Sequence, residues 1–243
     1  MRSDRADQDQ SHDPGRQPLR LPNEHMTKTA LAVEALRGAI LRGEIAQDQP
    51  LTVGRIAAQL GISPTPVREA IRTLQAEGLL RHEPHHSVSV TQYTIKDIHD
   101  IFRLRATLES QAARLAVPRL SDDDLAQLEA LGHEMERAAQ RQEIERVNLL
   151  NAQWHLLIYS AADNRVLLDL VQHLWKKFMW EGNWITPDHA ARSLAQHASL
   201  LAAIRTRDAS MTERLMREHI RSGEQASVEY LEARARRLSE PPV

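Results

Sequence analysis

Three histidines and one asparagine in the C-terminal half of the chain have the spacing of a metal-binding site. Asn151 and His155 are four residues apart in a predicted helix, so both side chains project from the same face. His197 and His219 each lie eleven residues from Asp208, where a turn between two helices is predicted. Each imidazole is therefore about 16 Å from that turn, and an antiparallel pair of helices places the two level with each other. Three converging imidazoles and an amide oxygen favour a divalent first-row metal ion, zinc or nickel above all.

The alternative is that these histidines are hydrogen-bonded polar groups in a helical core, because the chain has twelve histidines and chance pairs are common. A metal held by neutral imidazole should be lost as the pH falls below about 6, where histidine takes up a proton. The other histidines of the C-terminal half have no comparable partners in the sequence and are interpreted as ordinary.

Arg105 is the candidate for binding a small organic acid. It lies in a predicted helix beside Ile101, Phe102 and Leu108, so its charge is expected to be buried. A buried guanidinium needs an anion, and its planar fork matches a carboxylate. The alternative is an internal ion pair with Glu109, one helical turn further on.

Residues 51–74 predict a pair of short helices joined by a tight turn. Two apolar stripes with i, i+3, i+4 and i+7 spacing meet at Gly61-Ile62-Ser63. The second helix is expected to begin behind Ser63 or Thr65, where two prolines fit the first turn. A helix with an apolar back and an arginine-bearing front, docked on another by a short turn, is the layout of a helix-turn-helix. The apolar positions are Val53, Ile56, Ala57 and Leu60, then Val67, Ala70, Ile71 and Leu74.

The front of this second helix carries the expected DNA contacts. Arg68 lies near the end that would enter the major groove, where arginine can pair with guanine. Ser63 and Thr65 are expected to contact phosphate or base edges, and Arg72 is expected to contact phosphate.

Segments on both sides of this pair complete a winged helix. Residues 32–41 predict a preceding helix, and residues 79–82 and 88–91 predict two short strands. His85 and His86 lie at the tip between these strands and are further candidate DNA contacts.

The charge of this N-terminal module favours binding in pairs. Residues 27–90 hold seven basic and six acidic side chains, a net charge of +1. Because DNA affinity depends on neutralising phosphates, such a module needs a few focused arginines and a second copy. We therefore expect a homodimer, held by the C-terminal helices, on double-stranded DNA with a palindromic operator.

From Tyr93 onward the pattern is helical only, and it predicts an antiparallel bundle of six (six or seven) helices in a mainly α protein. The expected helices are 95–117, 122–142, 143–162, 165–182, 187–206 and 208–237. The chain is thus expected to divide into a disordered tail at 1–25, a winged helix-turn-helix at 26–92, an all-α domain at 93–237 and a tail at 238–243.

Composition limits the setting in which the protein works. The chain has no cysteine, which excludes disulfides and thiolate metal sites and fits a reducing compartment. It has no apolar run near the roughly 20 residues of a membrane span, and no apolar signal core at its N-terminus. We expect a cytoplasmic protein without a membrane partner, associated with the nucleoid when it is bound to DNA.

Two parts of the chain resemble one family of bacterial regulators. LRGAILRGEI, ISPTPVREAIRTLQAEGLL and the wing, within residues 28–91, resemble the DNA-binding domain of the GntR family. IFRLRATLESQAARLA, NAQWHLLIYSAADN and AQHASLLAAIRTRDASMTERLMREHI resemble the GntR subgroup with an FCD (FadR-type C-terminal) domain. The resemblance implies a winged helix followed by an all-α domain that binds ligand and forms the dimer.

The FCD resemblance also implies a function for individual residues. It implies an effector-facing Arg105 and a metal site at Asn151, His155, His197 and His219. The family has Asp or Asn at the first of these positions; with Asn151 the site lacks a carboxylate and should hold metal less tightly. Pro64 stands where the family often has Arg, and Ser87 replaces its usual wing Gly, so the operator contacts are expected to differ.

These features predict a ligand-responsive transcription regulator, a repressor, whose small carboxylate effector binds at a metal site. Two alternatives stay open, a metal-dependent hydrolase and a dedicated metal sensor, because three histidines with open coordination also describe a hydrolytic zinc site. His155, His197 and His219 do not lie in a His-Glu-x-x-His motif, and the chain has no Gly-rich phosphate loop. We therefore expect a protein that is not an enzyme.

Overall fold

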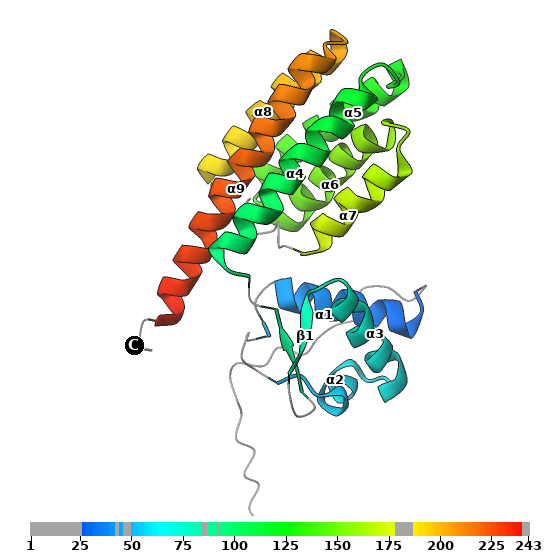
Figure 1. Cartoon of the computed structure of the whole chain (residues 1–243), viewed down its shortest axis with the longest axis vertical. Coiled ribbons are helices and arrows are strands. Elements are labelled where there is room, and N and C mark those ends of the chain that lie inside the picture. Colours follow the sequence, from blue (N-terminus) through cyan, green and yellow to red (C-terminus); the bar gives the residue numbers. More distant parts are fainter. Residues whose placement is uncertain are drawn as a thin grey trace, which may run out of the picture.

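The structure, a computed structural model, is mainly α, as predicted, and consists of an N-terminal module and a helical bundle (Figure 1). The tail predicted at 1–25 and the wing-tip candidates His85 and His86 lie outside the described residues. The described residues are 26–41, 44–45, 50–83, 87–91, 93–177 and 187–239.

The N-terminal module is a winged helix-turn-helix. Its elements are α1 (Lys28–Leu41), α2 (Val53–Leu60), α3 (Pro64–Ala76), β1 (Leu80–Glu83) and β2 (Ser87–Val90). Helix α1 begins four residues before its predicted start, because Thr27 Oγ1 accepts a hydrogen bond from Ala30 N at 3.2 Å and caps it. In this capped first turn Leu31 is a buried apolar residue, but Lys28 and Thr29 before it interrupt the apolar pattern.

Gly61 makes the tight turn between α2 and α3. Its φ of +65° is left-handed, which glycine adopts without a steric penalty, and its N–H is bonded to Ala57 O. Ser63 occupies the predicted N-cap position of α3, but its side chain makes no capping hydrogen bond. Both apolar stripes are buried as predicted, apart from Val53, which is partly buried.

The wing is an antiparallel pair of strands with Leu80 opposite Val90 and Glu83 opposite Ser87. The first strand begins and ends one residue later than predicted, and the second one residue earlier. Leu51 N donates to Val88 O at 2.7 Å, so the segment before α2 holds the second strand from outside the pair. This bridge fixes the wing to the helix-turn-helix.

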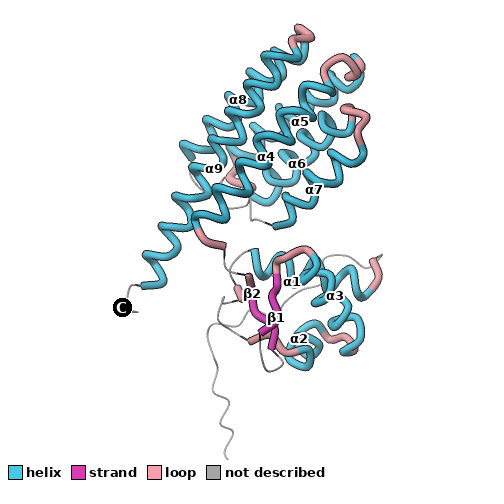
Figure 2. Tube along the Cα trace, in the orientation of Figure 1, coloured by secondary structure: helices cyan, strands magenta, loops and turns pink. Residues whose placement is uncertain are grey.

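Six helices form the bundle within the described part of the chain, in agreement with the predicted number (Figure 2). They are α4 (Ile95–Ala116), α5 (Asp122–Gln140), α6 (Ile144–Ser160), α7 (Arg165–Lys177), α8 (Pro187–Arg205) and α9 (Ala209–Ser239). Helices α4 and α9 pack along each other, while α6 packs on α5 and α7 on α4. The predicted last turn of α7, beyond Lys177, lies outside the described residues.

Two capping boxes fix where α4 and α5 begin. Thr94 Oγ1 accepts from Asp97 N at 3.1 Å while the Asp97 carboxylate accepts from Thr94 N at 2.8 Å. Ser121 and Asp124 make the same reciprocal pair at the start of α5.

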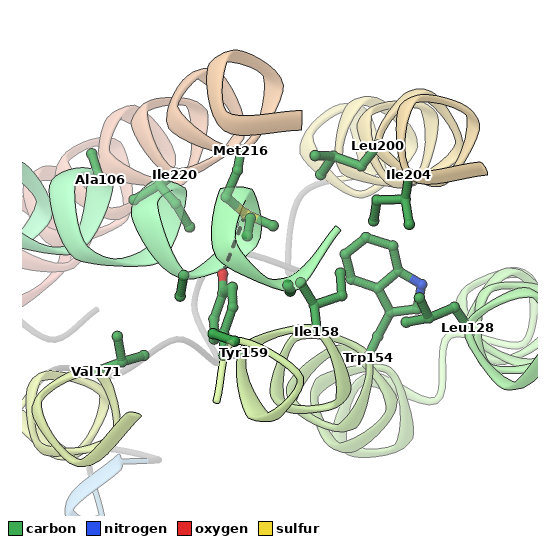
Figure 3. Close-up of a cluster of buried hydrophobic side chains, with 14 of the residues drawn as sticks. Ala106, Leu128, Trp154, Ile158, Tyr159, Val171, Leu200, Ile204, Met216 and Ile220 are labelled. Carbon is green, nitrogen blue, oxygen red and sulfur yellow. Dashed lines mark hydrogen bonds between the residues drawn. The ribbon is translucent and has the colours of Figure 1, made fainter. Parts of the chain in front are cut away.

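Each module has its own hydrophobic core. The bundle core includes Trp154, Ile158 and Tyr159 of α6; Figure 3 shows the Tyr159 hydroxyl directed at Met216 of α9 and the Trp154 ring beside Ile204 of α8 and Leu128 of α5. Among the helices of the described residues, none is long and apolar enough to cross a membrane.

Candidate metal centre and DNA-contacting face

The three predicted histidines meet inside the bundle. His155 comes from α6, His197 from α8 and His219 from α9, and each has at most 9% of its surface exposed. His155 Nε2 lies 3.3 Å from His197 Nε2 and 3.2 Å from His219 Nε2. One candidate ligand atom from each lies within 4.8 Å of the others, so a single ion could contact all three.

The turn between α8 and α9 sets the level at which His197 and His219 meet. Arg207 adopts a left-handed φ of 59° there, and its guanidinium donates to Val117 O at 2.9 Å. Asp208 Oδ1 accepts from Met211 N at 2.8 Å and caps α9. With the turn fixed at these residues, helices of equal rise bring the two imidazole rings to 4.7 Å between centroids.

Hydrogen bonds on the outer ring nitrogens orient two of the imidazoles. His219 Nδ1 lies 2.9 Å from Gln196 Oε1, an amide oxygen that only accepts, so His219 carries its proton on Nδ1. His155 Nδ1 lies 3.0 Å from the Tyr159 hydroxyl. The Nε2 of His219 therefore faces the other imidazoles as a lone pair, the form that binds metal.

Asn151 lies one helical turn before His155 on α6. Its Oδ1 is buried and has no hydrogen-bond partner within the described residues. A buried amide oxygen without a donor costs free energy, which a cation would recover. The donor set of three imidazole nitrogens and this oxygen therefore fits a divalent first-row metal.

Burial keeps the histidines neutral. It lowers the pKa of His197 to about 3. Burial also lowers the pKa of His155 well below its usual value, with smaller contributions from the two other histidines and from Arg105. The pKa of His219 is lowered well below its usual value by burial first, then by His197 and Arg105. This changes the expectation of metal loss near pH 6, because protons do not compete for such nitrogens until the pH is far lower.

Arg105 is buried as predicted, but it already holds an internal carboxylate. Its Nε donates to Glu109 Oε1 at 2.7 Å, and its guanidinium stacks over Phe102 at 4.5 Å. The ion pair considered as the alternative from the sequence is thus present. Two further donors reach the same carboxylate, Tyr159 at 2.8 Å and Trp175 at 3.0 Å.

Sequence reasoning therefore missed the polar surroundings of the histidines. Tyr159 lies four residues after His155, a helical spacing that could have signalled it. Glu109 was considered only as a partner of Arg105, but the fold brings its carboxylate to Tyr159, whose hydroxyl also contacts His155. Trp175 had no signal, because only the packing of α7 on α4 brings it to Glu109.

The expected DNA contacts lie together on one face of α3. Ser63, Thr65, Arg68 and Arg72 are all exposed, opposite the buried stripe of that helix. The back of α3 is held to α1, where Thr29 Oγ1 donates to Glu69 at 2.9 Å. An exposed, arginine-bearing helix on a rigid support has the arrangement of a major-groove reader.

A winged helix-turn-helix joined to a helical bundle with a buried polar cluster is the architecture of a bacterial one-component transcription regulator. Two family models match the chain, "Bacterial regulatory proteins, gntR family" over residues 28–90 and "FCD domain" over residues 100–222. The chain belongs to the gntR family of bacterial regulatory proteins, in the group with an FCD domain.

Named relatives are similar over most of their length. The HTH-type transcriptional regulator McbR of Escherichia coli is 27% identical over 190 residues, which cover 76% of this chain and 85% of McbR. The HTH-type transcriptional repressor RspR of the same organism is 26% identical, with 76% of this chain and 82% of RspR covered. The solved structure of E. coli McbR/YncC matches 85% of this chain and 99% of its own with a TM-score of 0.73 and 25% identity.

These relatives settle the class of protein. The chain is a transcription regulator with a DNA-binding module, and regulators of this family bind DNA operators. Family and relatives are regulators rather than enzymes, which sets aside the hydrolase considered from the sequence.

Proposed function

We propose that this protein is a dimeric, metal-dependent repressor that releases its operator when a small organic acid binds in the helical domain. The observation that carries the proposal is the buried cluster of three neutral imidazoles of His155, His197 and His219, with the Asn151 amide one helical turn before His155 and its oxygen without a hydrogen-bond partner among the described residues. When bound, a divalent metal, zinc or nickel, supplies a Lewis acid with open positions for a carboxylate.

In this proposal Arg105 holds the other end of the effector. The Arg105 guanidinium donates from Nε to Glu109, and its planar fork matches a carboxylate in shape. Its positive charge is close enough to lower the pKa values of His155 and His219. A carboxylate held by both metal and guanidinium gains two charge-assisted contacts in a site shielded from water.

Two contacts at the end of α3 support a route from this site to the DNA-reading helix. Trp175 on α7 donates to Glu109. The Nζ of the next residue, Lys176, lies 3.8 Å from Oε1 of Glu77 at the C-terminal end of α3. Tyr93, just before α4, donates to Gly78 O at 3.2 Å. An effector that moves α4 or α7 would therefore move the support of the recognition helix.

Exposed apolar side chains support dimerisation through the bundle. Leu104 on α4 is 54% exposed, and Val166 and Leu170, one turn apart on the neighbouring α7, are 70% and 48% exposed. Large exposed apolar side chains on two neighbouring helices of a regulator fit an interface with a second copy. Two copies would place two winged helices on a palindromic operator, with Arg68 of each at guanine, Ser63 and Thr65 at phosphate or base edges, and Arg72 at phosphate.

The first test is the metal content of the full-length protein, purified without an affinity tag. We expect about one equivalent of metal in the wild type and none in His197→Ala. His133→Ala is the matched control, because His133 is 63% exposed and paired with Glu136 on α5. Equal, substoichiometric metal in all three proteins would leave the histidines as ordinary polar core residues.

The second test measures binding to the promoter upstream of the protein's own gene. Release by candidate organic acids only when metal is present supports the proposed effector site. Release by the metal alone identifies a metal sensor instead. Acid release that is the same in metal-free protein and in His197→Ala would refute a metal-bound effector.

A further inference from the structure

Glu109 is a fully buried carboxylate on which three donors converge. Arg105 of α4 donates from Nε at 2.7 Å and Trp175 of α7 from Nε1 at 3.0 Å, both to Oε1. Tyr159 of α6 donates to Oε2 at 2.8 Å. Every contact reaching Glu109 comes from a donor, so the carboxylate acts here only as an acceptor.

This arrangement decides where the proton of Tyr159 lies. A phenol has one proton, and an ionised carboxylate is the strongest acceptor that the hydroxyl reaches. Met216 Sδ, at 3.2 Å, is a weak thioether acceptor and does not compete. Tyr159 therefore donates its hydroxyl proton to Glu109, and its oxygen can only accept a further hydrogen bond.

The only bond that Tyr159 can then make with His155 is as an acceptor. His155 Nδ1, 3.0 Å from that oxygen, must carry the ring proton. Its Nε2 is then a bare lone pair, 3.3 Å from His197 Nε2 and 3.2 Å from the equally bare Nε2 of His219, and two facing acceptors at that distance repel each other unless a cation lies between them. The hydrogen bonds between Glu109 and Tyr159 and between Tyr159 and His155 thus select the His155 tautomer whose bare Nε2 lies at the centre of the cluster.

We propose that Glu109 is a positioning residue of the metal site, which acts through Tyr159 to hold His155 with its proton on Nδ1 and its Nε2 available to metal. The proposal rests on the metal site proposed above. It assigns Glu109 a role that an ion pair with Arg105 alone would not require, since that pair would be satisfied with a phenylalanine at position 159.

The direct test is the ring tautomer of His155 in metal-free, full-length protein, read from the 15N chemical shifts of histidine-labelled samples. The wild type should show a protonated Nδ1 and a bare Nε2. Glu109→Gln should reverse this, because the new amide can donate to the tyrosine oxygen and free the tyrosine proton for His155 Nδ1. Tyr159→Phe should give a mixture, because the ring nitrogen loses its partner.

Zinc affinity of the same proteins, measured by competition with a chromophoric chelator, is the second readout. Both variants should bind zinc about 10- to 100-fold more weakly than the wild type, as expected for loss of a partner to a liganding histidine. Glu129→Gln is the matched control, since Glu129 on α5 pairs with Arg205 of α8 and has no contact with the histidines among the described bonds. It should keep both the tautomer and the zinc affinity of the wild type.

The outcomes separate this proposal from the proposed function. A wild type with a bare Nδ1 on His155, or variants with its tautomer unchanged, would overturn the role of Glu109. If the wild type shows the expected tautomer of His155 but binds no zinc, the proposed metal site is refuted while the role of Glu109 in orienting His155 is supported. If a variant fails to fold, the tautomer of the wild type alone still decides.

Discussion

Acidification of the metal-free protein should destabilise it through the three clustered histidines. Each is held neutral in the folded state, with the pKa of His197 lowered to about 3 and those of His155 and His219 also lowered. In the unfolded chain each takes up a proton near its usual pKa of about 6.5. Below that pH the unfolded state binds more protons than the folded state, so stability must fall as the pH falls.

The size of the effect follows from these pKa values. A histidine that stays neutral in the folded state loses about 2 kcal/mol of stability between pH 7.5 and pH 5.0. Three such histidines together lose about 6 kcal/mol, a large share of the roughly 5–15 kcal/mol by which a domain is stable. Carboxylates with lowered pKa values, such as Asp124 and Glu213, lose their contribution only near and below about pH 4, so the decline in this window comes from histidines: the three of the cluster and His189, whose pKa is also lowered by burial.

Urea unfolding at fixed protein concentration, followed by tryptophan fluorescence, is a suitable assay. Trp154 reports on the site directly, since its ring centroid lies 4.5 Å from that of His197. His197→Gln should flatten the pH dependence by about 2 kcal/mol over this window, because it removes one of the three titrating groups of the cluster. The exposed His133 provides the control: His133→Gln should follow the wild type.

A free energy of unfolding that is constant from pH 7.5 to 5.0 would refute the reasoning. It would mean that the imidazoles take up protons in the folded state, which requires a site far more accessible to water. A decline that is identical in wild type and His197→Gln would assign the effect to other groups.

Three further outcomes follow from the same geometry. Arg68→Ala should weaken binding to labelled promoter DNA by about 1–3 kcal/mol per half-site; unchanged affinity with an intact fold would move base recognition away from α3. Leu170→Asp should shift the protein toward monomer in sedimentation velocity, because it places a charge in the proposed interface, and an unaltered dimer would exclude that part of α7. Ser121→Ala should lower the free energy of unfolding by about 0.5–2 kcal/mol, since the α5 capping box loses its bond to Asp124 N; no change in urea midpoint would count against this cap.

The sequence alone was sufficient to predict the secondary-structure elements and the position along the bundle at which His197 and His219 meet. The helix-turn-helix, the wing and six bundle helices follow from apolar spacing and turn residues, which are local properties of the chain. The meeting of His197 with His219 follows from the constant rise of a helix counted from the turn at Asp208. The missed start of α1 depended on one side-chain cap at Thr27, which apolar spacing does not encode.

The surroundings of those side chains were decided only by tertiary structure. Helical spacing alone offered Arg105 either Glu109 or an organic acid as its anion, whereas packing brought two further donors to Glu109 from α6 and α7, 50 and 66 residues away. The protonation of His155 likewise depends on burial and on bonds from other helices. Desolvation and hydrogen bonding are properties of the whole set of packed neighbours, whereas periodicity records only which face of its own helix a residue occupies.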